Sequence, residues 1–249
     1  MLVSVVIITK NEEKNIGRCL NSVDWADEIL VIDSGSTDKT RDICNKFSKC
    51  KFIETDWLGF GRTKQYGVEM ASYDWVLSLD ADEEVSTELA QSIRSLKQDS
   101  SITAFKIRRS SFYLSKMINF SGWQNDSPVR FFNKKFANFD EKIVHEKVSI
   151  FQGECSYLDS NILHYPYPDI ETHIQKINLY TTLQAKETSN KNKKFLLFRA
   201  LISSIFKFIK MYILRYGFLD GKEGFILALL SGFYVFLKYV KLWATKKGK

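Results

Sequence analysis

Four short runs of apolar, largely β-branched or aromatic residues recur in the first eighty positions, and this recurrence constrains the fold more than any other feature. The runs have the length and composition of strands buried in a parallel sheet. They are Leu2–Thr9, Glu28–Asp33, Lys51–Ile53 and Trp75–Leu79. Segments with helical spacing separate them, and this alternation predicts a mainly parallel sheet with right-handed crossovers. The predicted fold class is therefore α/β.

The helices between these runs are also indicated by the sequence. They are expected over Ile16–Val23, from a cap at Thr37 or Asp38 to Phe47, and over Arg62–Ala71. After the fourth run the pattern becomes mixed. One helix is expected over residues 87–97, and short strands of mixed direction are expected at 104–113, 129–133, 143–148 and 158–165. We interpret this second half as an extension of the same sheet.

Carboxylates follow two of the predicted strands at the point where each strand ends. Asp80 and Asp82 come directly after the fourth run, and Asp33 ends the second. Open α/β sheets bind their ligands beyond the carboxyl ends of the strands. Two carboxylates at this spacing suit Mg²⁺ or Mn²⁺, which such sites share with substrate phosphates. The sequence therefore predicts a nucleotide-diphosphate site, where Asp33 would bind a base or ribose hydroxyl or else cap its own turn.

Motifs that the chain lacks argue against several nucleotide-binding classes. No G-x-G-x-x-G follows the first strand, as a nicotinamide enzyme would require, and no G-x-x-x-x-G-K-[ST] of a P-loop enzyme occurs. Haloacid-dehalogenase phosphatases place Asp-x-Asp after their first strand, usually before Thr or Val. Here the pair follows the fourth strand and Glu83 comes next, which argues against that class.

Positive charge is concentrated at the C-terminal end of the chain. From Lys193 onward there are twelve Lys/Arg and two acids, whereas residues 1–192 carry 24 bases and 27 acids. This asymmetry predicts an anionic partner for the tail, and the acidic balance of the remainder argues against nucleic acid. We expect a catalytic domain over residues 1–192 and a basic helical tail over residues 193–249.

The tail has the pattern of amphipathic helices. Nearly all of its first segment is apolar, and the polar residues Arg199, Ser203, Lys207 and Lys210 fall on one helical stripe. The run Phe225–Leu237 carries no charge, but its thirteen residues fall short of the ~20 that a membrane span needs. Apolar faces with basic residues suit a membrane interface. We therefore expect the tail to bind an anionic membrane surface, with packing on protein as the alternative.

The cysteines and the N-terminus indicate a compartment. The four cysteines form no C-x-x-C pair, and Cys19 and Cys44 fall in predicted helices, where buried thiols are expected. The N-terminal residues lead directly into the first strand without the features of a signal peptide. We therefore expect a cytoplasmic protein, peripheral to the inner face of the cytoplasmic membrane.

Several segments together resemble glycosyltransferase family 2, in particular its lipopolysaccharide inner-core β-glucosyltransferase branch. The segments are SVVIITKNEE, EILVIDSGSTDKT, WVLSLDADEE, SGWQNDSPVRFFNKK, KIVHEKV and RYGFLDGKEGFILALL. They extend over nearly the whole chain. The resemblance implies a GT-A fold, which is Rossmann-like with a mainly parallel sheet and a mixed second half, here followed by C-terminal amphipathic helices.

The resemblance also implies roles for single residues of the donor site. The loop after the first strand, with Thr9, Asn11 and Glu12, would bind the nucleotide, and Glu12 would lie near the base. Asp33 would contact the nucleoside.

A metal motif and phosphate contacts complete the expected donor site. Asp82 would be the more direct ligand of Mn²⁺ or Mg²⁺, and Asp80 would lie nearer the ribose or sugar. A metal can neutralise the diphosphate as it leaves. The expected phosphate contacts are Lys64, Arg130 and Lys134, with solvated surface bases as the alternative.

An inverting transferase needs a general base that deprotonates the acceptor hydroxyl. Many family members place this acid in a Glu-Asp pair late in the domain, whereas this chain has His145-Glu146, as the core-transferase branch does. Glu146 is the expected base and Asp126 the second candidate. His145 is expected to orient groups or to bind phosphate.

These features favour an inverting glycosyltransferase that moves a hexose, glucose from UDP-glucose, onto a lipid-linked saccharide such as the lipopolysaccharide inner core. One alternative is a metal-dependent nucleotidyltransferase, although the Gly-rich signature expected after its first strand is missing. A non-enzymatic membrane- or nucleic-acid-binding module, formed by the basic tail, is the other.

Overall fold

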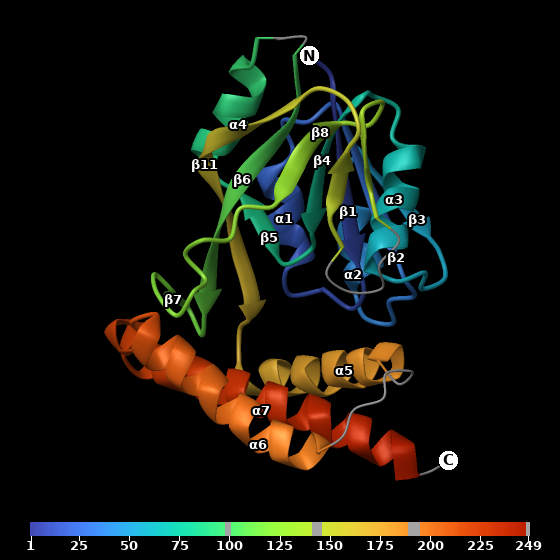
Figure 1. Cartoon of the computed structure of the whole chain (residues 1–249). Helices are drawn as coiled ribbons and strands as arrows, with labels where there is room; N and C mark the ends of the chain where they lie inside the picture. Colours follow the sequence, from blue (N-terminus) through green and yellow to red (C-terminus); the bar gives the residue numbers. More distant parts are fainter. Residues whose placement is uncertain (98–100, 141–145, 189–194, 248–249) are drawn as a thin grey trace. The chain divides into compact units, whose positions relative to one another are not determined.

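The computed structural model describes residues 1–97, 101–140, 146–188 and 195–247, and Figure 1 shows its elements in chain order. The chain forms two compact units. Unit 1 comprises Met1–Arg109 and Asp126–His164, and unit 2 comprises Ser110–Asn125 and Tyr165–Lys249. The functional division into residues 1–192 and 193–249 stays a prediction.

Unit 1 is built on a sheet whose first four strands are parallel, as the sequence predicts. They are β1 (Val3–Thr9), β2 (Glu28–Asp33), β3 (Cys50–Glu54) and β4 (Trp75–Asp80), in the order β3-β2-β1-β4. All residues of β1 and β2 are buried, as in a parallel sheet covered on both faces. The register places Thr9 beside Asp33 and Ile8 beside Asp80, so the carboxylate-bearing strand ends are neighbours.

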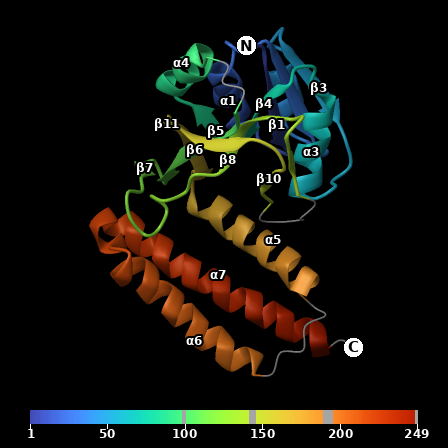
Figure 2. The ribbon, with the colours of Figure 1, turned by 45° about the horizontal axis from the view of Figure 1, so that its top comes forward.

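Helices cover both faces of this sheet, as Figure 2 shows for α1 and α3. One core contains residues of α1 (Ile16–Ser22), α2 (Thr40–Cys44) and α4 (Thr87–Ser95), and the other contains residues of α3 (Phe60–Met70). Gly67 lets α3 approach closely, because a Cβ there would collide with Val6. Helix α2 ends before the expected Phe47. Its N-cap residue is Lys39 rather than Thr37 or Asp38, and Oδ1 of Asp38 accepts a hydrogen bond from the N–H of Thr40 at 3.0 Å.

The second half of unit 1 adds strands of mixed direction, as expected. They are β5 (Glu83–Val85), β8 (Val129–Asn133), β9 (Ala137–Phe139), β10 (Val148–Ile150) and the unit 1 parts of β6 (Ile102–Tyr113) and β11 (Glu154–Tyr167). Strand β8 is antiparallel to β4 and β6, and β5 is antiparallel to β11.

One expected strand of unit 1 is displaced along the chain. Of the expected range 143–148, residues 143–145 lie outside the described part, and Glu146 and Lys147 are not in a strand. The N–H of Lys147 instead donates to Oδ1 of Asp140 at 3.0 Å. The strand therefore begins only at Val148, from which β10 pairs with β9.

Unit 2 is mostly helical, which confirms the expected C-terminal helices. It contains the short β7 (Lys116–Met117), α5 (Ile170–Thr188), α6 (Leu196–Ile209), the π-helical turn η1 (Lys210–Leu214), the 3₁₀ turn η2 (Gly217–Asp220) and α7 (Gly221–Lys247). The sequence analysis does not predict α5. Lys241 of the tail joins α7 to α5, because its Nζ donates to Oδ1 of Asn178 and to the hydroxyls of Thr181 and Thr182.

A loop of unit 2 is held by the segment that joins α6 to α7. The carboxylate of Asp220 accepts hydrogen bonds from the N–H groups of Asn119 and Phe120 at 3.0 and 3.1 Å, and from the hydroxyl of Ser121 at 3.3 Å. Asp220 itself is 2% exposed. The RYGFLDG segment therefore has a packing role within unit 2.

Candidate active site

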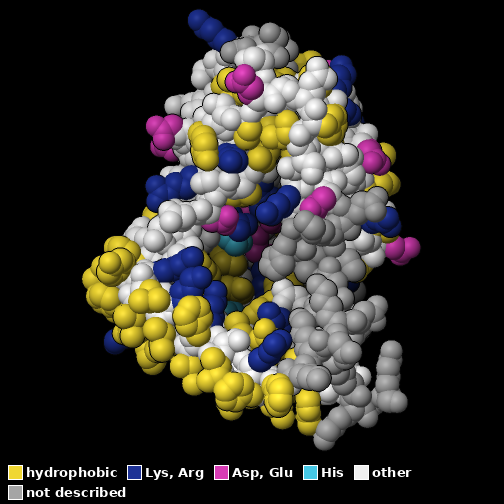
Figure 3. Space-filling model, viewed as in Figure 1, with side chains coloured by type: hydrophobic (Ala, Val, Ile, Leu, Met, Phe, Trp, Pro, Cys, Tyr) yellow, Lys and Arg dark blue, Asp and Glu magenta, His cyan; other side chains and the backbone are white. Residues whose placement is uncertain are grey.

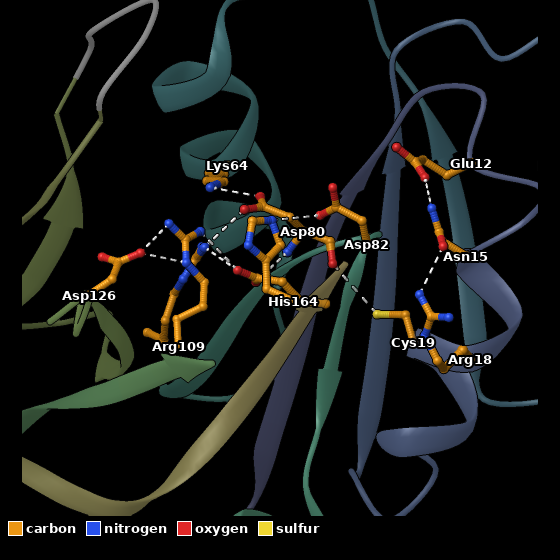
Figure 4. Close-up of polar contacts among 12 residues, drawn as sticks. Glu12, Asn15, Arg18, Cys19, Lys64, Asp80, Asp82, Arg109, Asp126 and His164 are labelled. Carbon is orange, nitrogen blue, oxygen red and sulfur yellow. Dashed lines mark hydrogen bonds and ion pairs between the residues drawn. The ribbon is translucent and has the colours of Figure 1, made fainter. Parts of the chain in front are cut away.

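The carboxylate of Asp80 lies between two cations from other elements of unit 1 (Figure 4). Its Oδ1 is 2.8 Å from Nζ of Lys64 on α3, as Figure 4 shows. Its Oδ2 is 2.9 Å from Nη2 of Arg130 on β8. Both cations are buried, with exposed fractions of 2% and 4%. Lys64 and Arg130, which the sequence predicts to bind phosphate, thus hold Asp80 in this structure.

The two cations control the ionisation of Asp80. Burial by itself would raise the pKa of this carboxyl, but Lys64 and Arg130 outweigh burial and hold the pKa well below its usual range. Burial likewise opposes the charge of Arg130, yet Glu83 and Asp80 raise the pKa of its guanidinium. Asp80 is therefore a carboxylate at neutral pH, and both of its oxygens are engaged.

Glu83 is another buried carboxylate at this strand end, and no role for it is predicted from the sequence. Its Oε1 accepts hydrogen bonds from Arg130 at 2.7 Å and Arg109 at 3.2 Å, and its Oε2 accepts one from the N–H of Asp80 at 2.9 Å. Burial raises the pKa of Glu83, with Asp80 adding to the rise and both arginines opposing it. The residue directly after Asp-x-Asp is the signal that could have identified it. We call Asp80, Glu83, Lys64 and Arg130 the strand-end cluster.

Asp82 lies in the turn between β4 and β5 and faces a histidine from a strand distant in sequence. Its Oδ1 is 3.6 Å from Nε2 of His164 on β11 (Figure 4). The ladder between β5 and β11 pairs His164 with Glu83, the neighbour of Asp82, and this register brings the two side chains together. His164 is not among the site residues predicted from the sequence, because its only local signal is a lone histidine inside a predicted strand.

The two candidate bases are each bound to a cation. Oε1 of Glu146 is 2.5 Å from Nζ of Lys64, and Oδ2 of Asp126 accepts a hydrogen bond from Nε of Arg109 at 2.7 Å. Lys64 belongs to the strand-end cluster and Arg109 is bonded to it, so both acids lie next to that cluster. His145 lies outside the described residues.

The loops after β1 and β2 carry the residues expected to bind the nucleotide. Asp33 accepts hydrogen bonds from the N–H groups of Gly35 and Ser36 at 3.0 and 2.8 Å, so it caps its own turn. Oδ1 of Asn11 accepts a hydrogen bond from the N–H of Thr37 at 2.7 Å. Asn11 therefore ties the two loops together.

Thr9 and Glu12 lie at the start of the same region. The hydroxyl of Thr9 is buried and has no hydrogen-bond partner among the described residues. Oε2 of Glu12 accepts a hydrogen bond from the side-chain amide of Asn15 at 2.7 Å, and Asn15 accepts one from Arg18 at 2.8 Å (Figure 4). This chain of contacts orients Glu12 on the loop.

A divalent cation fits the charge and the donor atoms of this site. When all are ionised, its carboxylates exceed its cations by two charges. The carboxylates are those of Asp80, Asp82, Glu83, Asp126 and Glu146, and the cations are Lys64, Arg109 and Arg130. Asp82 and His164 present an oxygen and an imidazole nitrogen side by side. Within the described ranges no group of three or more His, Cys, Asp or Glu could hold a metal, so substrate phosphates would supply further ligands.

Two solved glycosyltransferase structures share this fold. Residues 1–349 of S. aureus TarS, in complex with UDP-GlcNAc, align with a TM-score of 0.52 and 15% identity over 100% of this chain and 93% of that chain. The mannosyltransferase PcManGT from Pyrobaculum calidifontis, in complex with GDP-Man and Mn²⁺, aligns with a TM-score of 0.51 and 16% identity over 99% and 79%. The expected GT-A fold is therefore confirmed.

Sequence relatives agree with the family resemblance. The chain is 35% identical to the uncharacterized glycosyltransferase RT0209 of Rickettsia typhi, over 96% of this chain and 86% of the relative. It is 25% identical to the lipopolysaccharide core biosynthesis glycosyltransferase LpsC of Rhizobium meliloti, over 96% and 91%. The profile of "Glycosyl transferase family 2" matches residues 4–163. These matches disagree with both the nucleotidyltransferase and the non-enzymatic alternative. The chain belongs to glycosyltransferase family 2 and is a nucleotide-sugar-dependent glycosyltransferase.

Proposed function

We propose that the chain transfers glucose from UDP-glucose, with inversion, onto a lipid-linked saccharide such as the lipopolysaccharide inner core. The observation that carries the donor side is the strand-end cluster, which fixes Asp80 and places Asp82 beside it beyond the end of β4. The identity to LpsC over nearly the whole chain supports an acceptor of the named kind.

The polar side chains at the carboxyl ends of β1, β2 and β4 would form a preorganised site for the nucleotide-sugar donor. Thr9, Asn11, Glu12 and Asp33 would bind the nucleoside, because the register of β1 and β2 and the contacts of Asn11 bring their loops together. Charges that are fixed before the reaction cost no reorganisation when the diphosphate develops its charge. The buried ion pairs of Asp80 provide such fixed geometry.

Asp82, with His164 and Asp80 beside it, would hold Mn²⁺ or Mg²⁺. The PcManGT complex with Mn²⁺ supports a metal in this fold. When bound, the metal supplies a Lewis acid that stabilises the departing diphosphate. Lys64 and Arg130 hold Asp80 and would contribute positive charge toward the phosphates.

On the acceptor side, Glu146 would take the proton of the attacking hydroxyl, with Asp126 as the second candidate. Lys64 orients the Glu146 carboxylate through the 2.5 Å contact, and Arg109 orients Asp126. A base must lie within hydrogen-bond reach of the hydroxyl that it deprotonates. His145 keeps its expected part in orienting groups or binding phosphate.

The tail would bring the enzyme to the cytoplasmic face of the membrane, where a lipid acceptor is anchored. Helix α6 buries only Leu196 and Ala200, and Figure 3 shows hydrophobic side chains gathered over the C-terminal helices. Anionic lipids attract Lys/Arg with roughly 1 kcal/mol each near the surface. By length and composition alone, the helical segment Gly217–Thr245 also meets the requirements of a membrane span.

A panel of nucleotide sugars, with and without Mn²⁺, tests the donor. We expect slow, metal-dependent release of UDP from UDP-glucose without acceptor. Release from another nucleotide sugar would correct the donor, and metal-independent release would contradict the metal.

Two conservative variants test the base. Glu146→Gln should keep the slow release of UDP and lose transfer to acceptor, whereas Asp126→Asn should keep transfer. The opposite result would assign the base to Asp126.

A further inference from the structure

Unit 2 contains a hollow of about 310 Å³ in which basic side chains converge. It lies between α6, η1 and α7, and its wall includes Ser203, Lys207, Lys210 and Arg215 together with apolar side chains such as Val235. Ser203, Lys207 and Lys210 belong to the polar stripe that the sequence shows over residues 199–210. Three of the four stripe residues therefore line the hollow.

Among the residues of the tail that the structure describes, no acid pairs with the cations of this hollow. Both acids of the tail are engaged elsewhere, because Asp220 binds backbone N–H groups and Glu223 pairs with Lys116 at 3.4 Å. Burial lowers the pKa of Lys207, and the neighbouring cations, Arg215 first, lower it further. The hollow thus concentrates positive charge that an incoming anion would neutralise.

The surrounding backbone holds one of these cations in position. The N–H of Ser121 donates to the carbonyl oxygen of Arg215 at 2.9 Å. Gly122 has a φ of +88°, and a Cβ at this glycine would collide with the guanidinium of Arg215. Lys210 begins a π-helical turn, a feature that is frequent at functional sites.

Exposed apolar side chains occur next to the hollow in sequence and in its wall. Phe206, which lines it, is 56% exposed, and Ile213 and Leu214 of η1 are 52% and 61% exposed. Figure 3 shows basic side chains lying among hydrophobic ones over the C-terminal helices. Cations inside a hollow with apolar side chains around it match a ligand that has an anionic head and an apolar remainder.

We propose that this hollow binds the phosphate group of one anionic lipid, with Lys207, Lys210 and Arg215 as its ligands. The exposed apolar side chains would contact the acyl chains of the same lipid. The inference rests on the proposed membrane association and adds to it a discrete, saturable site, which diffuse attraction to a charged surface does not require.

Vesicle sedimentation at about 1 M salt tests this site, because a Debye length of about 3 Å suppresses diffuse attraction. Vesicles of phosphatidylcholine with phosphatidic acid are compared with vesicles that carry sulfatide at equal charge. The variant Lys207→Gln/Lys210→Gln is compared with Arg199→Gln/Lys222→Gln, which removes two exposed tail charges. We expect at least about tenfold weaker binding to phosphatidic acid vesicles for the first variant only, because direct hydrogen bonds between charged groups persist at a salt concentration that suppresses diffuse attraction.

Calorimetry with soluble probes separates a lipid headgroup from a free anion. The wild type should bind monomeric dihexanoyl phosphatidic acid at one site, and Lys207→Gln/Lys210→Gln should lose this binding. Equally tight binding of inorganic phosphate would overturn the lipid assignment. Equal losses in both double variants, or equal binding to sulfatide vesicles, would overturn the discrete site.

The same proteins show which proposal fails. Metal-dependent UDP release from UDP-glucose uses residues of unit 1, so it should persist in both double variants. If the wild type binds vesicles without preferring phosphatidic acid, the discrete lipid site is contradicted and the proposed function is not. Absence of UDP release from the wild type would contradict the proposed function whatever the lipid result.

Discussion

The two compact units differ in whether their basic side chains are bonded to carboxylates. In unit 1, Lys64 and Arg130 are buried and bonded to carboxylates. In unit 2, Lys207 and Lys210 line a hollow next to exposed apolar side chains, and the acids of the tail are bonded elsewhere. The strand-end cluster of unit 1 therefore contains its own counter-charges, whereas the cations of the hollow in unit 2 have no carboxylate partner among the described residues of the tail.

This difference connects each unit to a different task. Buried ion pairs are costly to form, but they keep carboxylates in one geometry before a substrate arrives. Unpaired bases beside exposed apolar surface add little to folding and are available to an amphipathic partner. The contrast predicts that equivalent substitutions will have unequal effects in the two units.

The largest difference is expected between Arg130→Met and Lys207→Met. Loss of Arg130 leaves Asp80 and Glu83 with one fewer buried cation, which should lower the free energy of unfolding by about 3–5 kcal/mol. Loss of the Lys207 charge should change it by less than about 0.5 kcal/mol or raise it, because burial and like charges disfavour that cation. Urea denaturation measures both, and equal losses would contradict the comparison.

Asp82→Ala tests whether unit 1 holds the metal ion. Removal of this carboxylate should lower metal-dependent UDP release about 10²–10³-fold, as expected for a group that stabilises developing charge. His164→Ala should weaken Mn²⁺ binding, which paramagnetic resonance measures without turnover. The exposed Asp24→Ala serves as the control and should change neither quantity. Unchanged Mn²⁺ affinity in both site variants would refute the metal assignment.

Acidification should destabilise the two units in sequence. Burial, aided by Lys176, lowers the pKa of His173 in unit 2 from 6.5 to about 4, so the unfolded chain binds the extra proton and stability falls between these pH values. Burial by itself would raise the pKa of Glu28 in unit 1. Hydrogen bonds from Lys51 and Ser72 outweigh burial and lower this pKa from 4.5 to about 2. The contribution of Glu28 to the stability of the folded state is complete above pH 4.5 and is lost as the pH falls toward 2.

Each of these two contributions amounts to at most about 3 kcal/mol. Amide hydrogen exchange along a pH titration should show loss of protection in unit 2 before unit 1. His173→Phe should flatten the first step and leave the second in place. Simultaneous loss in both units would show that these groups do not set the order.

The smallest effect concerns exposed apolar side chains. Phe198→Ser/Ile205→Ser on α6 should weaken vesicle binding by about tenfold or more, because each side chain would bury apolar surface in the membrane. Stability should change by less than about 0.5 kcal/mol, since both residues are more than half exposed. The control Phe151→Ser/Tyr157→Ser alters exposed side chains of unit 1 and should leave vesicle binding unchanged. A similar loss in both variants would remove the distinction between the units.

Local patterns predict a large part of the fold. Strands β2 and β8 begin and end where the sequence analysis expects them, because apolar runs and their polar ends are local properties. Cys19 and Cys44 are buried as expected. The expected strand at 143–148 and the unpredicted α5 show the opposite case, where pairing with β9 and packing against α7 decide the element.

The sequence by itself determined the parallel half of the sheet, the carboxylates at its strand ends and the basic stripe of the tail. Periodicity and strand termini are encoded within a few neighbouring residues. Only the tertiary structure decided that Lys64 and Arg130 occupy the oxygens of Asp80, and that His164 faces Asp82. These side-chain contacts depend on strand register and on helix packing between segments that are distant in sequence. No local pattern specifies the resulting distances.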